Sequence, residues 1–362
     1  MKMTLVVRSY FLLMMLVGFS ALSQTKKEKA QKMGIEAVQI MDEGDYNTSI
    51  KMLKKARKLD PESIHYDYEI AYALYSQKKY KKAIKILEKI IVDPEAVDVH
   101  FQLLGNAYDL IGMPDKAILS YVKGQAVFPQ SGKLYLEPGI VEYYRENYDK
   151  AISYWEKGIS VEPNFASNYF WLGRTFSFSD ELIWSVLYGE IFMNLERNTK
   201  RTVEMSEILF KSYSKAIQLF PDSVSVNFSN RFELTKDDLE IFPFSMTYGI
   251  NMVLSATISL LDRENNNITI RDIHDIRSLF LANWFEKGND STYTNVLFDF
   301  QREISVNGFM EPYDFWLLMK GNEEAFGVWY EENETLFNAF AEWFNKIDLE
   351  IDVANYFSRA KK

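Results

Sequence analysis

The stretch NYDKAISYWEKGISVEP, residues 147–163, decides the fold because its pattern has already occurred three times in the chain. Related stretches begin at Asp45, Lys79 and Met113, so the starting point advances by 34 positions each time. A sequence that repeats at a fixed period of about 20–50 residues builds a stack of similar units, in which each unit covers its neighbour's apolar face. The stretch therefore predicts a repeat architecture.

Two positions of the repeat always carry small residues. When the first unit is counted from Ala30, the eighth position holds Ala37, Ala71, Gly105, Gly139 and Gly173, and the twentieth holds Ser49, Ala83, Ala117, Ala151 and Ser185. Small residues at recurring positions predict that two helices cross closely there. We expect two sets of larger residues to fill the space beside these crossings. They are Tyr46, Tyr80, Pro114 and Tyr148 at the seventeenth position, and Leu53, Leu87, Tyr121 and Trp155 at the twenty-fourth.

Prolines mark the ends of the second helices, because the residue before a proline disfavours helix. Pro61, Pro129 and Pro163 stand at this place, and the second unit has Pro94 instead. The spacing and the residue types of these units resemble the tetratricopeptide repeat, a helix-turn-helix unit of about 34 residues. The resemblance covers residues 30–165 in four regular copies. It implies an all-α solenoid.

The repeats are expected to become irregular after residue 165. A fifth unit begins with SNYFWLGRTF, but its second helix, within DELIWSVLYGEIFMNLER, reads as longer than the repeat allows. A further helix is predicted over about Val203–Phe220. We interpret residues 166–221 as degenerate repeats, so the solenoid spans 24–221 and ends near Pro221.

Residues 222–362 are predicted to form a mainly helical C-terminal domain. The segment DSVSVNFSN, 222–230, alternates like a short strand but also suits an extended linker. Helical patterns follow at about Phe244–Leu261, Arg271–Glu286, Tyr293–Ser305, Pro312–Met319 and Glu323–Asn345. Residues 242–261 carry no charge before Asp262, yet Asn251 and weak hydropathy favour a buried helix over a membrane span. Contact of this segment with a membrane stays open.

The last helix carries an aromatic stripe, which we expect to face the core. The stripe consists of Phe326, Trp329, Tyr330, Phe337, Phe340, Trp343 and Phe344. The alternative is a platform for a cofactor or a glycan. Glu331, Glu332 and Glu334 are predicted to face solvent.

The first residues predict export. MKMTLVVRSYFLLMMLVGFSALSQ combines basic, apolar and small residues in the order of a secretory signal, with cleavage expected after Ser23. A membrane anchor fits less well, because the uncharged run is shorter than the roughly 20 residues of a span. The chain has no cysteine, which excludes disulfides and a lipidated N-terminal cysteine. We therefore expect a periplasmic or extracellular protein that is not a lipoprotein.

Charge and motifs argue against nucleic acid and against catalysis. The net charge of −10 would repel phosphate backbones. The sequence has no glycine-rich phosphate loop, nucleophile elbow or metal-spaced histidine pair. His65 and His100 are expected to face solvent or a groove, and His274 cannot face its neighbour Asp275, because consecutive helical residues point about 100° apart. We predict no catalytic residue, no metal site, no cofactor and no enzymatic activity.

The resemblance implies a concave groove lined by the first helix of each unit. Transferred to this sequence, the lining is Tyr68, Glu69, Tyr72, Tyr75, Gln102, Asn106, Asp109, Glu137, Tyr143, Tyr144, Phe170, Trp171 and Arg174. Aromatic rings with polar tips suit peptides, and the acidic groups favour a neutral to basic partner. Family members that grip a partner's terminal carboxylate use groove Lys, Arg and Asn. Only Asn106 and Arg174 remain here, so no such clamp is expected.

We therefore predict a non-enzymatic adaptor or scaffold that holds a protein partner in this groove. One alternative is that several of the groove tyrosines pack against the next repeat. The other is a glycan-binding or glycan-processing protein, in which the rings stack on sugars and Glu69, Asp109 and Glu137 supply acids.

Overall fold

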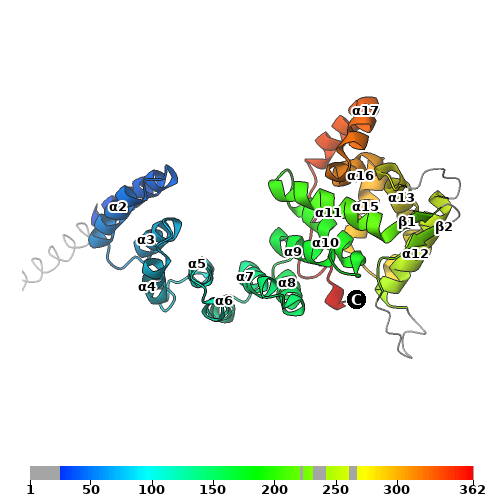
Figure 1. Cartoon of the computed structure of the whole chain (residues 1–362). Coiled ribbons are helices and arrows are strands. Elements are labelled where there is room, and N and C mark those ends of the chain that lie inside the picture. Colours follow the sequence, from blue (N-terminus) through cyan, green and yellow to red (C-terminus); the bar gives the residue numbers. More distant parts are fainter. Residues whose placement is uncertain (1–24, 221–222, 231–241, 261–266, 362) are drawn as a thin grey trace, which may run out of the picture. The chain divides into compact units, whose positions relative to one another are not determined.

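The computed structural model describes residues 25–361 except 221–222, 231–241 and 261–266. The predicted signal and the predicted boundary at Pro221 lie outside the described residues. The chain forms two compact units, Met1–Pro129 and Gln130–Lys362, which are treated separately below. Most of the described chain is helical, in agreement with the all-α prediction (Figure 1).

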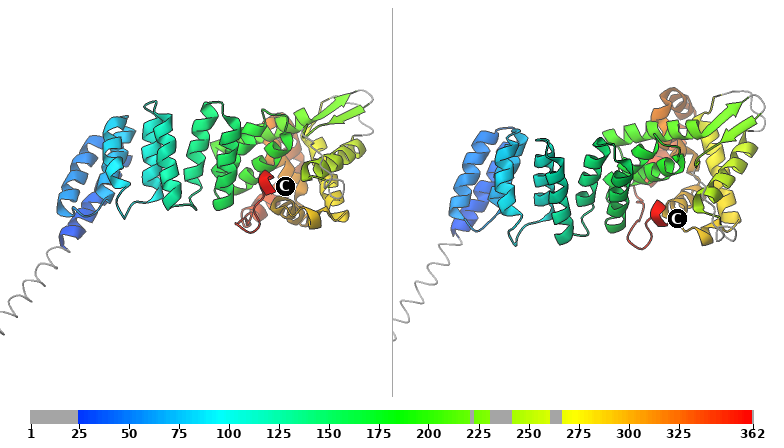
Figure 2. Two further views of the ribbon diagram at one scale, coloured as in Figure 1. Left: turned by 90° about the horizontal axis from the view of Figure 1, so that it is seen from below. Right: turned by 60° about the horizontal axis from the view of Figure 1, so that its bottom comes forward.

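The first unit consists of consecutive antiparallel helices. Residues 25–42 form its opening helix. It continues with α2 (Tyr46–Leu59), α3 (His65–Ser76), α4 (Tyr80–Ile90), α5 (Asp98–Asp109) and α6 (Pro114–Val127). From α2 onward each helix packs against the next, which is the arrangement of stacked helical hairpins (Figure 2). One period of the sequence repeat thus corresponds to one pair of helices.

The second unit begins with two more such hairpins. They are α7 (Lys133–Tyr144) with α8 (Tyr148–Val161), and α9 (Ala166–Phe176) with α10 (Leu182–Leu195), followed by α11 (Lys200–Ala216). Helix α10 has 14 residues, as α8 does, so the expectation of an over-long helix in the fifth unit is wrong. The prediction of helix as far as Phe220 is also wrong, because the helix ends at Ala216, whose carbonyl accepts a hydrogen bond from the N–H of Asn227.

A small antiparallel hairpin follows α11. Strand β1 (Ile217–Phe220) pairs with β2 (Ser223–Val226), and Ile217 lies opposite Val226. Of the two interpretations of residues 222–230, the strand is therefore correct for residues 223–226.

The described residues after β2 are mainly helical, as predicted. It contains α12 (Phe244–Ser259), α13 (Ile270–Glu286), α14 (Asn289–Thr292), α15 (Val296–Val306), α16 (Met310–Leu318), η2 (Met319–Gly321), α17 (Glu323–Phe344) and η3 (Arg359–Lys361). The five predicted helices are all present, with ends shifted by a few residues. Figure 1 shows α13, α15 and α16 gathered beside α10 and α11, and the contacts agree. The last hairpin and these helices share one hydrophobic core.

Helix α12 is only half-buried, which corrects the expectation of a buried helix. Tyr248, Met252 and Ala256 are buried on one side. The other side is apolar but open, with exposed fractions between 42% and 57% at Ile250, Val253, Leu254 and Ile258. Within the described ranges, no helix combines the length and apolarity that a membrane crossing requires.

The small residues of the repeat lie at close helix crossings, as predicted. A Cβ atom added to Gly139 would clash with the indole of Trp155, and one added to Gly105 would clash with the ring of Tyr121. Both rings are buried, so the residue at the twenty-fourth position fills the space that the eighth position leaves.

The seventeenth position does not behave as predicted. Tyr46, Tyr80 and Pro114 are half-buried and Tyr148 is exposed. Each is the first residue of its helix, where the chain is still at the surface. These four residues therefore do not fill the helix crossings.

Candidate functional site

The predicted groove residues fall in both units. Those of α3 and α5 belong to the first unit, and those of α7 and α9 to the second. The two sets are described separately.

Helix α3 presents one aromatic ring openly. Tyr72 is 41% exposed, whereas Tyr68 and Tyr75 are half-buried. The ring of Tyr68 lies 4.8 Å from that of His100, and burial raises the pKa of Tyr68 to about 12. His100 itself is buried, and its Nδ1 accepts a hydrogen bond from the N–H of Val97 at 3.0 Å. The expectation that His100 faces solvent or the groove is therefore wrong.

The polar residues of the first set differ in how exposed they are and in whether they already hold a hydrogen-bond partner. Glu69 is half-buried, and burial together with the charge of Asp42 raises its pKa. Asn106 accepts a hydrogen bond from the Tyr121 hydroxyl at 2.6 Å, so it holds the ring that fills the α5–α6 crossing. Gln102 is half-buried and Asp109 is exposed. Asn106 thus has a structural role besides any role in binding.

An aromatic cluster with one cation forms the second set. Tyr144 is 73% exposed, and its ring centre lies 5.6 Å from that of Tyr143 and 6.3 Å from that of Trp171. The guanidinium of Arg174 lies 5.2 Å from the Trp171 ring centre, and its Nε lies 3.1 Å from the carboxylate of Glu204. The cluster therefore combines a large apolar surface with a partly neutralised charge.

Two members of the second set are less available than predicted. Phe170 is buried and packs against Phe192 of α10 at 5.1 Å, so it belongs to the core. Its assignment to the groove is wrong, because its side of α9 is covered by the next helix. Glu137 is half-buried on α7.

A charged network lies inside the second unit, away from these faces. Arg277 of α13 donates two hydrogen bonds to Glu190 of α10, at 2.7 and 2.8 Å, and a third to Asp314 of α16 at 2.7 Å. Burial alone would lower the pKa of Arg277, but the charges of Asp314 and Glu190 outweigh it and raise that pKa well above its ordinary value. His274 Nδ1 lies 2.8 Å from Asp314.

Neighbouring side chains complete this network. Tyr213 accepts a hydrogen bond from Arg277 at 2.6 Å, and Gln301 and Tyr313 each donate to Glu190, at 2.7 and 2.9 Å. All three charged groups are therefore paired within the core. We assign the network, with His274, a packing role. The partner Asp314 could not be foreseen, since it lies 40 positions away.

Among the described residues, no group of three or more His, Cys, Asp or Glu side chains is placed to hold a metal ion.

Comparison with known proteins identifies the repeat. The family model described as "Tetratricopeptide repeat" matches residues 41–94, which include α2, α3 and α4. No curated protein matches the chain.

Several solved structures resemble it. One is MamA from Desulfovibrio magneticus RS-1, with 23% identity, 36% of this chain and 75% of that chain covered, and a TM-score of 0.33. Another is a thermophilic TPR protein of Thermus thermophilus, with 16% identity, coverage of 50% and 98%, and a TM-score of 0.42. A third is the C-terminal part of a TPR repeat-containing protein from Cytophaga hutchinsonii, with 13% identity, coverage of 80% and 96%, and a TM-score of 0.43.

The match to the family model falls within the regular sequence repeat, where the structure stacks one helical pair per period. Residues 41–94 therefore contain the tetratricopeptide repeat, and the same period continues in the regular units around them.

Proposed function

We propose that this protein is a non-enzymatic scaffold that binds a peptide segment of a partner on the first-helix faces of its repeats. Tetratricopeptide repeat proteins bind protein or peptide partners, and this chain contains the repeat. The observation that carries the proposal is the exposure of Tyr72 on α3 and Tyr144 on α7. Both are first helices, and exposed tyrosines give a large contact area at a small cost in conformational entropy.

The preferred partner segment is neutral to basic. Asp109 is exposed and Glu69 half-buried on the same helical faces as the tyrosines of the first unit. The whole chain carries a net charge of −10, which repels acidic partners and speeds association with basic ones. Arg174 does not reverse this preference, because Glu204 pairs with it.

We also propose that the scaffold acts outside the cytoplasm, in the periplasm or the extracellular space. The support is the order of basic, apolar and small residues in 1–23. A scaffold in that compartment would hold an envelope or secreted protein.

Peptide selection tests the binding proposal. Peptides selected on the wild-type protein from a random displayed library are measured by fluorescence polarisation against Tyr72→Ala and Tyr144→Ala. We expect at least one variant to weaken binding roughly tenfold, as truncation of a tyrosine anchor does. The selected peptides should carry no net negative charge.

The control is Leu119→Ala, at a residue that is 54% exposed on the second helix α6. Tyr143 is left unchanged, because its ring packs against Trp155 and Trp171 and its loss would disturb the core. Equal binding by both tyrosine variants and the wild type would refute the proposal. So would an equal loss with Leu119→Ala.

A further inference from the structure

Helix α17 is bent in the middle of its aromatic stripe. Asn333 has φ −124° and ψ 20°, outside the helical region, and its side-chain amide donates to the Trp329 carbonyl at 2.9 Å. A side chain that bonds a carbonyl one turn earlier competes with the backbone ladder and bends helices. The bend divides the stripe between two helical arms that point in different directions.

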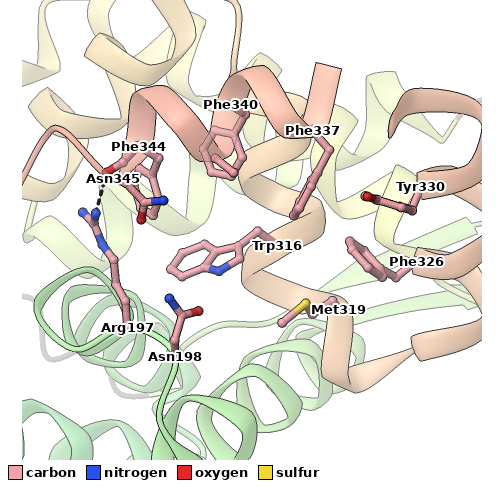
Figure 3. Close-up of a pocket in the computed structure, with 11 residues that line it drawn as sticks. Arg197, Asn198, Trp316, Met319, Phe326, Tyr330, Phe337, Phe340, Phe344 and Asn345 are labelled. Carbon is pink, nitrogen blue, oxygen red and sulfur yellow. Dashed lines mark hydrogen bonds between the residues drawn. The ribbon is translucent and has the colours of Figure 1, made fainter. Parts of the chain in front are cut away.

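The rings of the stripe differ in burial on both sides of the bend. Three of its rings are buried, as the core prediction requires: Trp329, Phe340 and Phe344. Four others are only half-buried, and three of these, Phe326, Tyr330 and Phe337, line a cavity of about 430 Å³ beside Trp316 and Met319, together with the buried Phe340 and Phe344. Figure 3 shows Trp316 across the middle of this cavity, with Phe326 and Tyr330 at one end and Phe337 above. The core prediction is therefore correct for part of the stripe only.

Polar groups gather at the opposite end of the cavity. They are Arg197 and Asn198, which follow α10, and Asn345, which follows α17 (Figure 3). Hydrogen bonds from Arg197 to the carbonyls of Phe344 and Ile347, at 2.5 and 3.0 Å, fix its guanidinium, which lies 3.7 Å from the Phe344 ring centre. A guanidinium carries five N–H donors, so two bonds do not exhaust it.

The charge of the lining is unusual for this chain. Although the protein carries a net charge of −10, the described residues that line the cavity include one cation and no carboxylate. The charge of Asp348, which does not line the cavity, also acts on Arg197, and within the lining the guanidinium is the group that complements an anion. The remaining wall is almost entirely aromatic.

We propose that this cavity binds a compact aromatic carboxylate. The ring lies between Trp316 and the Phe326, Tyr330 and Phe337 side chains, and the carboxylate faces Arg197, Asn198 and Asn345. The volume falls within the range of about 300–1,000 Å³ that small-molecule sites occupy. Aromatic rings pack favourably against one another in offset or edge-on geometry. A sugar fits less well, because its hydroxyls project all around the ring whereas the polar groups stand at one end.

Two kinds of ligand combine an aromatic ring with a nearby carboxylate. One is a free aromatic acid, and the other is a polypeptide whose last residue is aromatic and carries the terminal carboxylate. The proposal does not depend on the groove, since every lining residue belongs to α16, η2, α17 or a segment next to α10 or α17.

Calorimetric titration of the full chain tests the chemistry. The probes are N-acetyl-phenylalanine, its amide, N-acetyl-alanine, and a ten-residue peptide ending in phenylalanine with a free carboxylate. We expect the acid to bind, the amide to bind roughly tenfold more weakly because a charge-assisted hydrogen bond is lost, and the alanine derivative to give no heat. Binding of the peptide as tightly as the acid identifies a polypeptide end as the source, and binding of the acid alone identifies a small molecule.

Three variants locate the site. Asn345→Asp places a like charge at the polar end and should weaken binding of the acid roughly tenfold. Asn338→Asp adds the same charge to an exposed position of α17 that does not line the cavity, and should leave binding unchanged. Ala341→Phe adds a ring beside the cavity and should abolish binding while the circular dichroism spectrum is retained. Absence of binding by the acid and the peptide, equal affinity of acid and amide, or equal effects of the two aspartate variants would each overturn the proposal.

Discussion

The guanidinium of Arg277 is held by both oxygens of the Glu190 carboxylate, at 2.7 and 2.8 Å, although the two residues lie 87 positions apart. Glu190 belongs to the second helix of the fifth repeat unit, and Arg277 to a helix of the C-terminal region. Because both side chains are buried, neither can exchange its partner for water. The pair joins the last repeat to the helices that follow.

Loss of this pair should destabilise the second unit. Arg277→Leu leaves Glu190 and Asp314 as buried carboxylates without their cation, and removing one partner of a buried pair costs about 3–5 kcal/mol. All seven tryptophans lie between Trp155 and Trp343, so tryptophan fluorescence in urea reports on this unit alone. We expect a large drop in the urea midpoint. The matched change Arg271→Leu removes a partly exposed pair with Glu311 and should cost less than about 1 kcal/mol. Similar midpoints for the two variants would contradict the assigned role.

Gly139 should tolerate no side chain. Gly139→Ala places a methyl group against the Trp155 indole, whose Nε1 donates to the Leu136 carbonyl at 3.1 Å, and such overpacking costs about 1–3 kcal/mol. Urea unfolding followed by Trp fluorescence measures the loss. In the control Gly249→Ala, a Cβ meets no atom within 4 Å in the interior of α12, and stability should rise by about 0.5–1 kcal/mol. Stabilisation by the Gly139 change would show that the crossing is loosely packed.

Acid should weaken the second unit partly through Glu311. Burial alone would raise the pKa of Glu311, but hydrogen bonds from Arg271 and Trp329 outweigh this and lower the pKa from its ordinary 4.5. The stabilisation is therefore complete above pH 4.5 and is lost as the pH falls through the lower folded-state value. Urea midpoints measured from pH 6 down to about pH 2.5, roughly two units below the ordinary value, should fall more steeply for the wild type than for Glu311→Gln. The difference should stay below about 1 kcal/mol, since the pair is partly exposed. Parallel curves would rule out a contribution from Glu311.

Export should remove the first 23 residues. The small residues Ala21 and Ser23 precede Gln24 in the order that signal cleavage requires. Mass spectrometry of the protein from its source, or from a bacterial host that exports it, should find a mature chain that begins at Gln24. A chain that retains Met1 in the cytoplasmic fraction would contradict the proposal of export. An Ala21→Leu, Ser23→Leu double variant should accumulate uncleaved.

The sequence by itself determined the repeat, because a helical hairpin is specified locally. Gly139 and Trp155 lie only 16 positions apart, and a small residue recurs with a larger one at this spacing in each regular unit. The presence of helices in the C-terminal region could also be predicted, since each helix has its own apolar period. The helix ends could not be predicted as well. Helix α11 ends at Ala216, because a hydrogen bond from the Asn227 N–H to the Ala216 carbonyl closes the strand hairpin.

Only the tertiary structure decided which side chains are free to act. Phe170 and Tyr144 share the aromatic character that predicts a binding face, yet Phe192 covers the first and the second stays exposed. The carboxylates that pair with Arg277 lie on α10 and α16, and rings from both sides of the bend at Asn333 line one cavity. Periodicity encodes which face of a helix is apolar, but burial depends on the segment that packs against that face, and that segment lies far away in the chain.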